Sequence, residues 1–286
     1  MRRANLIEKE SEEITTVEGL TEVFESIAST QVAKVRNKVE LSNEFFQLLW
    51  KRYTSIRIDP GTRITNRELG DNQDKTVFII ISAEAGLSGD IDLRLIETML
   101  QNYNSSTTDI IVLGGHGALQ LMQRGIKFIH YFQIPETDQY IDVSPIIEAV
   151  QGYAKIIVYY EEYISLGVQD IKTINLVSRM RDMSQGADED VMTPEDTIFE
   201  PSLNEIAFEM EITMMTLALS QAILESTLAQ SASRFNAMAV AKKRATELLG
   251  EYRLEFHRAK RSENDRRLHE VLTSLKEKRK RVGVRR

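Results

Sequence analysis

The 286-residue sequence contains no cysteine, which excludes disulfide bonds and thiolate metal sites. It has only four histidines, and none of them stands at the short spacing of a paired metal ligand. The longest strongly apolar run, Val77–Ile81, is too short to cross a bilayer, and the N-terminus lacks the apolar core of a signal peptide. We therefore expect a cytosolic chain without a metal centre.

Proline is also scarce, and its placement divides the chain. All five prolines lie between Pro60 and Pro201, and the segments outside that range hold only three of the 14 glycines. Because proline breaks helices and glycine weakens them, the two ends are free to form long helices, whereas the middle is not. We predict an N-terminal coiled-coil helix over 1–59, an inserted domain over 60–200 and a C-terminal helix with a basic tail over 201–286.

Both ends carry a stripe of mainly apolar residues at alternating steps of three and four, which is typical of a coiled-coil seam. Polar residues such as Lys38 and Lys242 interrupt the stripes, so we expect these helices to have neighbours on several sides. Helices of this length do not fit within a compact globule, so the two must meet as an antiparallel or splayed hairpin, with the middle domain inserted between them. The seam residues that we predict are Ile14, Val17, Phe24, Val35, Leu224, Leu228, Phe235, Met238, Leu249, Tyr252 and Phe256.

The middle of the chain alternates strand and helix patterns, which predicts a small Rossmann-like α/β domain. The predicted strands are Thr76–Ser82, Asp109–Leu113, Lys155–Tyr160 and Asp170–Leu176. The predicted helices are Ile91–Tyr103, Gly117–Arg124 and Ser144–Tyr153. The acidic segment 181–200 is expected to be a surface loop. The fold class is therefore α/β, with two long terminal helices forming an antiparallel coiled coil and a small domain inserted between them.

Two glycine clusters follow predicted strands, where phosphate-binding loops and catalytic nucleophiles are often found. Gly114–Gly117 follows a strand and opens a helix, as a phosphate-binding loop does, but it lacks the full dinucleotide fingerprint and the sequence has no P-loop motif. Gly86–Gly89 also follows a strand, but Ser88 lacks the surrounding motif of a hydrolase nucleophile. Tight turns explain both clusters better than catalysis. We expect a mechanical or scaffolding part with no active site and no cofactor.

The net charge of −7 hides an asymmetry. The last eleven residues, Lys276–Arg286, hold seven basic groups and one acid, so the remainder of the chain is strongly acidic. An acidic body does not suit a broad nucleic-acid surface, although a short basic arm can still meet an anionic partner.

Motifs at both ends and in the middle occur in the order and spacing of one known family. The stretch Ile223–Arg261 is similar, without gaps, to that family's axle helix, and Ile81–Gly89 is similar to its Thr-Ser-Asp-Arg-Gly-Leu-Cys-Gly-Gly segment. Further matches are Ile14-x-x-Val17, Ala33–Arg36, Ile198–Pro201, Glu225–Ser226, Ala237–Met238 and Phe256-x-x-Ala259-Lys260. The chain resembles the gamma subunit of F-type ATP synthases, the central rotor shaft, as a divergent member.

The resemblance implies a non-catalytic subunit that rotates to couple ion flow through the membrane ring to ATP synthesis or hydrolysis. The implied partners are the alpha and beta subunits of the catalytic hexamer, an epsilon-like subunit and the membrane c-ring, with no nucleic acid. The implied location is peripheral, at the cytoplasmic face of the plasma membrane. Two alternatives stay open: the shaft of a specialised rotary ATPase that mainly hydrolyses ATP, and a free-standing coiled-coil scaffold that kept the fold. The coupling ion, proton or sodium, does not follow from this sequence.

Positions that match or adjoin the family motifs predict the contacts with the catalytic ring. The residues that we expect to form them are Lys34, Arg36, Lys260, Arg261, Arg266 and Arg267. The chain departs from the family just beyond its axle match. Where the family has Ile-Thr-x-Glu-Leu and a later Gly-Ala, this chain has Asn264–Leu268 and no Gly-Ala. The family's tip is small and apolar, whereas we expect this one to be polar and to end in the basic tail.

Overall fold

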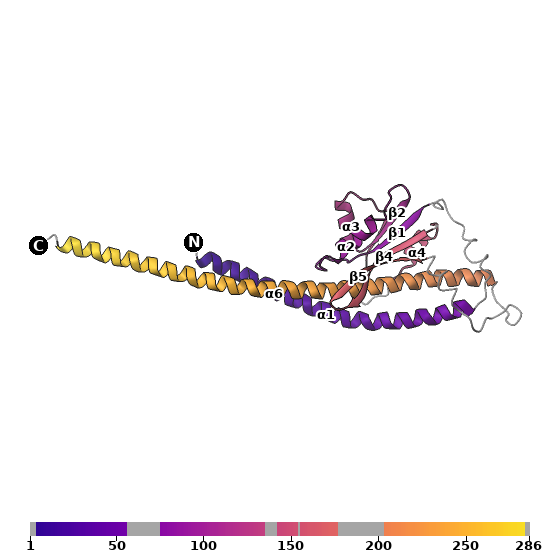
Figure 1. Cartoon of the computed structure of the whole chain (residues 1–286), viewed down its shortest axis with the longest axis horizontal. Coiled ribbons are helices and arrows are strands. Elements are labelled where there is room, and N and C mark those ends of the chain that lie inside the picture. Colours follow the sequence, from indigo (N-terminus) through magenta and orange to yellow (C-terminus); the bar gives the residue numbers. More distant parts are fainter. Residues whose placement is uncertain (1–3, 56–74, 135–141, 154, 177–202, 284–286) are drawn as a thin grey trace. The chain divides into compact units, whose positions relative to one another are not determined.

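The computed structural model describes residues 4–55, 75–134, 142–153, 155–176 and 203–283 (Figure 1). Contacts divide the chain into two compact units: the helical unit, Met1–Ser26 with Met238–Arg286, and the sheet unit, Ile27–Ala237. The division falls inside both long helices, α1 (Ala4–Ser55) and α6 (Leu203–Gly283). The domain boundaries predicted at 59/60 and 200/201 lie outside the described residues, as does the segment 181–200.

A five-stranded sheet in the order β3-β2-β1-β4-β5 forms the centre of the sheet unit. Its strands are β1 (Thr76–Ile81), β2 (Thr108–Leu113), β3 (His130–Phe132), β4 (Lys155–Ser165) and β5 (Val168–Asn175). The first four strands of the sheet order are parallel, and β5 runs antiparallel to β4. The predicted α/β class, with long terminal helices around a small inserted domain, is confirmed.

Both faces of the sheet are covered by helices, as Figure 1 shows for the sheet unit. The helices are α2 (Ile91–Leu100), α3 (Gly115–Gln123), α4 (Ser144–Val150) and the first part of α6. In β1, Phe78 and Ile80 pack with α2 and α3, whereas the alternate residues Val77, Ile79 and Ile81 pack with α4 and α6. A central strand between two helical layers has to be apolar on both sides, and this is why its sequence is a continuous apolar run.

The predicted strands agree with the structure except at two places. β4 continues to Ser165, five residues beyond its predicted end, because it forms a long hairpin with β5. β3 was not predicted, since a three-residue edge strand is too short to show a periodic pattern. The helix predicted over Ile91–Tyr103 ends at Leu100, and the next residues form a turn.

α6 supplies the core helix of the sheet unit. Its buried residues Met214, Leu219 and Ile223 pack against the sheet. Among the described helices, α6 alone is long and apolar enough to cross a membrane by length and composition, but 44% of its most apolar stretch is buried in the protein.

In the helical unit, α1 and α6 run antiparallel. Thr246 Oγ1 donates a hydrogen bond to Glu18 Oε1 at 2.6 Å, and Lys242 Nζ lies 3.1 Å from Glu22 Oε1 and 3.5 Å from Glu25 Oε2. Positions that rise along α1 therefore face positions that fall along α6. The antiparallel pairing predicted from the sequence is confirmed for this unit.

Candidate functional site

The glycine cluster at the start of α3 is shaped by close packing. Gly114 has a φ of +96°, and a Cβ there would lie 2.1 Å from the carbonyl oxygen of Ser82. A Cβ on Gly117 would lie 2.3 Å from Ser82 Oγ. Only glycine fits at both positions because the start of α3 touches the chain that leaves β1. The tight turn expected from the sequence explains this cluster.

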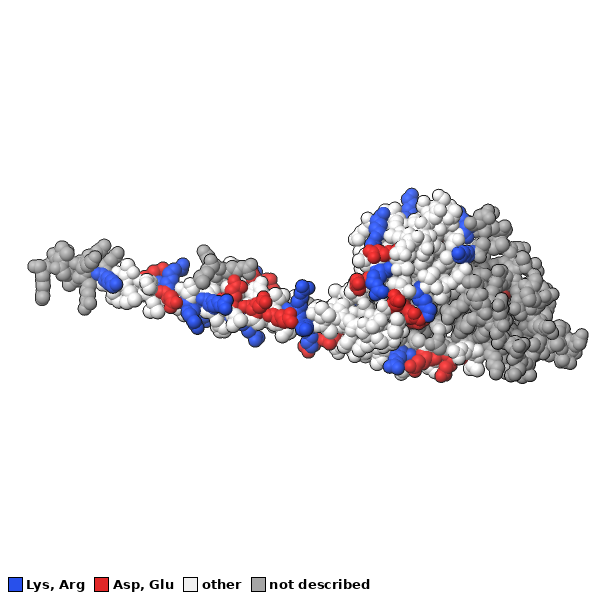
Figure 2. All heavy atoms as spheres, in the orientation of Figure 1, with Lys and Arg blue, Asp and Glu red and all other residues white. Residues whose placement is uncertain are grey.

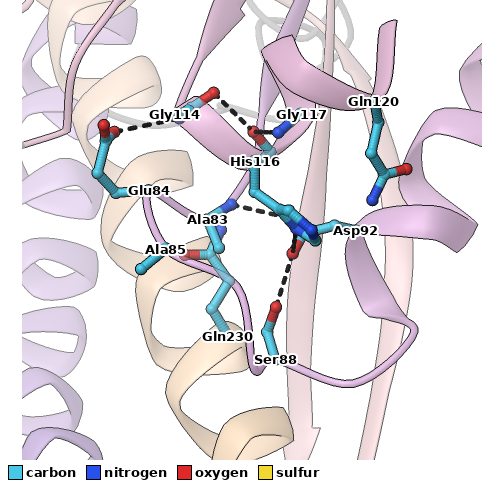
Figure 3. Close-up of polar contacts among 12 residues, drawn as sticks. Ala83, Glu84, Ala85, Ser88, Asp92, Gly114, His116, Gly117, Gln120 and Gln230 are labelled. Carbon is cyan, nitrogen blue, oxygen red and sulfur yellow. Dashed lines mark hydrogen bonds and ion pairs between the residues drawn. The ribbon is translucent and has the colours of Figure 1, made fainter. Parts of the chain in front are cut away.

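The backbone N–H groups at the start of α3 have no partner within the helix, but they are bonded to another part of the protein (Figure 3). The N–H groups of three successive residues donate to the segment after β1: Gly115 to Glu84 Oε2 at 3.3 Å, His116 to the Ala83 carbonyl at 3.0 Å and Gly117 to Ser82 Oγ at 3.0 Å. These are the groups that would bind a phosphate at a helix N-terminus. The Glu84 carboxylate therefore stands where a phosphate would have to bind.

Other partners hold Glu84 in this position. Tyr131 donates its hydroxyl proton to Glu84 Oε1 at 2.9 Å, and the Ile134 N–H donates to Oε2 at 3.1 Å. Burial raises the pKa of Tyr131, and the hydrogen bond to Glu84 raises it further. The carboxylate thus joins β3 to the start of α3.

We predict that the chain alone binds no nucleotide, because the donors of its phosphate-like turn are engaged. Isothermal titration of the purified chain with magnesium-ATP should give no heat of binding. The same titration with inorganic phosphate separates an anion effect from a nucleotide effect. A micromolar dissociation constant for magnesium-ATP would contradict this prediction.

A second polar cluster surrounds Asp92, in the first turn of α2. Asp92 is fully buried; its Oδ1 accepts the Ala83 N–H at 2.8 Å, and its Oδ2 accepts Ser88 Oγ at 2.7 Å. His116 Nδ1 lies 2.9 Å from the same Oδ2, and Figure 3 shows these groups converging on Asp92. In a hydrolase triad the histidine stands between serine and carboxylate. Here serine and histidine both bond to the carboxylate, so the cluster holds the loop and two helices together.

Side chains of α6 form hydrogen bonds with the end of β1 and the loop that follows it. Ser226 Oγ contacts the Ile81 carbonyl at 3.3 Å, Ser233 Oγ donates to the Ser88 carbonyl at 2.6 Å, and Arg234 Nη2 donates to the Ala85 carbonyl at 3.2 Å. The loop after β1 therefore contacts α2, α3 and α6. This joint connects the sheet to the long helix within the sheet unit.

Every seam residue predicted on α6 is at least half-buried. Leu228, Met238 and Leu249 are buried, and the half-buried residues are Leu224, Phe235, Tyr252 and Phe256. On α1, Val35 is buried and Ile14 is half-buried.

Two seam residues predicted on α1 are exposed, which corrects the stripe there. Val17 is 50% exposed and Phe24 is 37% exposed, whereas the next residues along the chain, Glu18 and Glu25, are half-buried. The glutamates turn inward because Thr246 and Lys242 of α6 face them. The hydrogen bond to Glu22 raises the pKa of Lys242, and the charges of Glu22 and Glu25 raise it further.

The six basic residues predicted to contact partners are all exposed, but they differ in what they touch. Four have a neighbour on their own helix: Arg36 with Glu40 at 3.4 Å, Arg266 with Glu270 at 3.6 Å, Arg267 with Glu263 at 3.2 Å, and Lys260 above the Phe256 ring at 5.3 Å. Lys34 and Arg261 form no ion pair with any residue that the structure describes. These two charges are the most available to a partner.

The far end of α6 has an apolar stripe that the sequence analysis missed. Val271 and Leu272 stand three and four residues after Leu268, and Leu275 stands four and three residues after them. Each of the four side chains is between 55% and 60% exposed. The tip was expected to be polar, and the structure corrects this: it is polar on one side and apolar on the other. The spacing alone would have revealed the stripe, because leucines at such steps share one face of a helix.

Positive and negative side chains alternate along the helical unit on the face shown in Figure 2.

The basic tail was predicted over Lys276–Arg286. The helix α6 continues into it as far as Gly283, and residues 284–286 lie outside the described part.

Comparison with known proteins identifies the fold and its relatives. A curated ATP synthase gamma chain of Malacoplasma penetrans is 23% identical, with 96% of this chain and 99% of that protein covered. A second, of Clostridium novyi, is 24% identical, with 93% and 95% covered. A chain in the mitochondrial ATP synthase structure of Euglena gracilis (OSCP, F1 and c-ring, rotational state 3) has a TM-score of 0.68 at 13% identity, covering 95% of this chain and 94% of that chain.

The family model described as ATP synthase matches residues 4–276, which is nearly the whole chain. The match includes both long helices up to the exposed stripe, together with the inserted sheet domain. This chain is therefore a member of the ATP synthase gamma-subunit family.

Proposed function

We propose that this chain is the central rotor shaft of an F-type ATP synthase, coupling ion flow through the membrane ring to ATP synthesis or hydrolysis by rotation. The observation that carries the proposal is the far end of α6. The family match extends to residue 276, and every residue from Asn264 to Lys276 is exposed to solvent. A helix end with an apolar stripe and no cover among the described residues requires a partner.

The partner that suits this end of α6 is a hexamer of alpha and beta subunits that surrounds it. A single helix presents a different side to each of several identical neighbours. Rotation would then exchange those contacts in turn and shift the conformational populations of the neighbours by the difference in contact free energy. This role needs no active site in the shaft, since the nucleotide chemistry takes place in the partners.

The other partners in this proposal are the c-ring and an epsilon-like subunit, and the complex is peripheral at the cytoplasmic face of the membrane. Structures similar in fold include the rotor of Euglena gracilis ATP synthase, with a TM-score of 0.62, and the central stalk and c-ring of Tetrahymena thermophila, with a TM-score of 0.59. At 14% and 15% identity to this chain these structures support the fold alone, whereas the family match supports the role.

Affinity purification of the chain from native membranes tests the proposal. We expect alpha-, beta- and epsilon-like subunits and the c-ring to accompany it at constant stoichiometry. A chain that purifies alone would contradict the proposal and favour the free-standing scaffold.

The unusual sequence of the tip favours a second candidate function, a rotary ATPase that mainly hydrolyses ATP. Sealed vesicles with an imposed ion gradient distinguish the two, because only a synthase makes ATP under that gradient.

We propose Lys34, Arg36, Lys260 and Arg261 as the coupling contacts with the beta subunits. Changing all four to glutamate should lower ion pumping per ATP hydrolysed by about fivefold and leave assembly intact, since exposed charge pairs contribute about 1 kcal/mol or less each. Lys34 and Arg261 should account for most of the loss, because their charges have no ion pair within the described chain. The measurement is acidification of inverted vesicles divided by phosphate release.

Arg124→Glu with Lys127→Glu is the matched control for this set. Both residues are exposed in the sheet unit, at the end of α3 and in the segment that follows it. Normal pumping by the quadruple variant, or an equal loss in the control, would remove these residues from the coupling contact.

A further inference from the structure

Glu161 on β4 is a fully buried carboxyl group without a cation beside it. Its exposed fraction is 0%, and no lysine or arginine among the described residues forms an ion pair with it. Its polar surroundings are Ser226 and Gln230 of α6 and the Asp92 carboxyl of α2. An isolated ionised carboxylate is very unfavourable in such a place, so the group has to be neutral or compensated.

Counting the protons available to these hydrogen bonds favours the neutral form. Ser226 Oγ lies 3.3 Å from the Ile81 carbonyl and 3.3 Å from Glu161 Oε2, and it accepts the Gln230 amide proton at 3.0 Å. A hydroxyl has one proton, so it cannot donate to both oxygens. If Glu161 carries a proton on Oε2 and donates it to Ser226, then Ser226 is free to donate to Ile81, and each of these three contacts has its own proton.

The remaining carboxyl oxygen supports the same assignment. Glu161 Oε1 has no hydrogen-bond partner among the described residues. An unpaired oxygen of a neutral carboxylic acid is much less costly to bury than one that shares a negative charge.

Asp92 is the second carboxyl group of this cluster. It accepts hydrogen bonds from the Ala83 N–H and the Ser88 hydroxyl, and His116 Nδ1 lies 2.9 Å from its Oδ2. Burial raises the pKa of Glu161 well above its ordinary value, and the Asp92 charge raises it further, whereas the neighbouring Gln230 and Ser226 side chains lower it.

The neighbouring strand brings no compensating charge. On β5, Ile171 stands opposite Glu161. The charged residues beside Ile171 are engaged elsewhere: Asp170 pairs with Arg94 at 3.1 Å, and Lys172 pairs with Glu162. The groups that face Glu161 from α2 and α6 are thus one carboxyl group and two neutral side chains, and His116 of α3 contacts Asp92.

We infer that Glu161 holds a proton at neutral pH and that this proton stabilises the contact between β4 and α6. The contact then weakens when alkaline pH removes the proton, which makes it a pH-sensitive attachment of the long helix to the sheet. The inference rests on the fold of the sheet unit and is independent of the proposed rotary function.

Glu161→Gln tests the inference, because glutamine has nearly the same shape and is neutral at every pH. The unfolding equilibrium constants of the wild-type chain and the variant are measured by urea titration between pH 5 and pH 9. A folded-state pKa raised above the unfolded value gives stability that is complete at low pH and falls as pH rises. The wild-type constant should therefore increase relative to the variant by about tenfold per pH unit until the folded-state pKa is passed.

Glu162→Gln is the matched control, since Glu162 is the adjacent residue and pairs with Lys172 at the surface. It should change stability by a constant amount across this pH range. If the curves of wild type and Glu161→Gln run parallel, the inference is wrong.

A measurement on the wild-type protein decides the question even if the variant folds poorly. Carbon-13 NMR of glutamate-labelled full-length chain should show one carboxyl signal with a protonated chemical shift at pH 7, assigned by its absence in Glu161→Gln or, failing that, Glu161→Ala. Amide exchange of α6 residues 225–236 should accelerate at alkaline pH beyond the intrinsic rate. An ionised signal from Glu161 at pH 7 would overturn the inference.

Discussion

Gly114→Ala should destabilise the chain by about 3–5 kcal/mol, a large part of the stability of an ordinary domain. The added Cβ would lie 2.1 Å from the Ser82 carbonyl oxygen and 2.8 Å from the Ser82 carbonyl carbon. These are backbone atoms at the end of a central strand, so they cannot rotate away. The φ of +96° adds a conformational cost of about 1 kcal/mol or more for a residue with a side chain. Urea unfolding followed by circular dichroism measures the loss.

Two other glycines separate the two costs. Gly125 also has a positive φ, +69°, but a Cβ there would meet no atom within 4 Å. Gly167 has neither a positive φ nor a neighbour within 4 Å. We expect Gly125→Ala to cost about 1 kcal/mol and Gly167→Ala almost nothing. Equal losses at Gly114 and Gly125 would show that steric overlap contributes nothing and that the turn adapts.

Replacing Leu268, Leu272 and Leu275 by glutamine should lower the affinity of the chain for the alpha–beta hexamer by about 100-fold or more. The three side chains share one face of α6 and are more than half exposed. Fully burying a leucine contributes about 1.5–3 kcal/mol, so loss of three is large even when burial is partial. Glutamine favours helix almost as well as leucine, so α6 itself should persist. Binding of labelled chain to purified hexamer gives the dissociation constant.

The control changes three polar residues of the same stretch: His269→Gln, Glu270→Gln and Ser274→Gln. All three are exposed, so this variant has the same number of new glutamines and the same helix length. We expect its affinity to stay within about twofold of the wild type. An unchanged affinity of the leucine variant would show that the stripe does not face the hexamer.

The residues that periodicity placed on the α6 stripe are at least half-buried, whereas two of those that it placed on the α1 stripe are exposed. The α6 stripe is apolar at most steps, so its buried side was visible without a partner. On α1, burial at Glu18 and Glu25 depends on Thr246 and Lys242, which lie more than two hundred residues away in the sequence. Hydrophobicity instead favoured Val17 and Phe24, one residue away, and these are exposed.

The polar clusters could not be predicted from the sequence, for a related reason. Asp92 and Glu161 look like ordinary surface acids in the sequence, and only the tertiary fold brings Ser226 and Ala83 to them. The glycine turn was predicted correctly as a turn, but the sequence does not show that Glu84 occupies it. β1 and β2 were predicted almost to the residue, because a continuous apolar run bounded by turns is specific to a strand buried on both faces.

The Glu84 carboxylate is part of the chain whose helix it bonds, and this gives it an advantage over any dissolved anion. A group on a short flexible tether already has an effective concentration in the millimolar range. A side chain fixed by Tyr131 and Ile134 exceeds that value, because little freedom remains to be lost. Free phosphates therefore compete poorly for the start of α3. The turn between β2 and α3 keeps its geometry while nucleotide levels around the protein rise and fall.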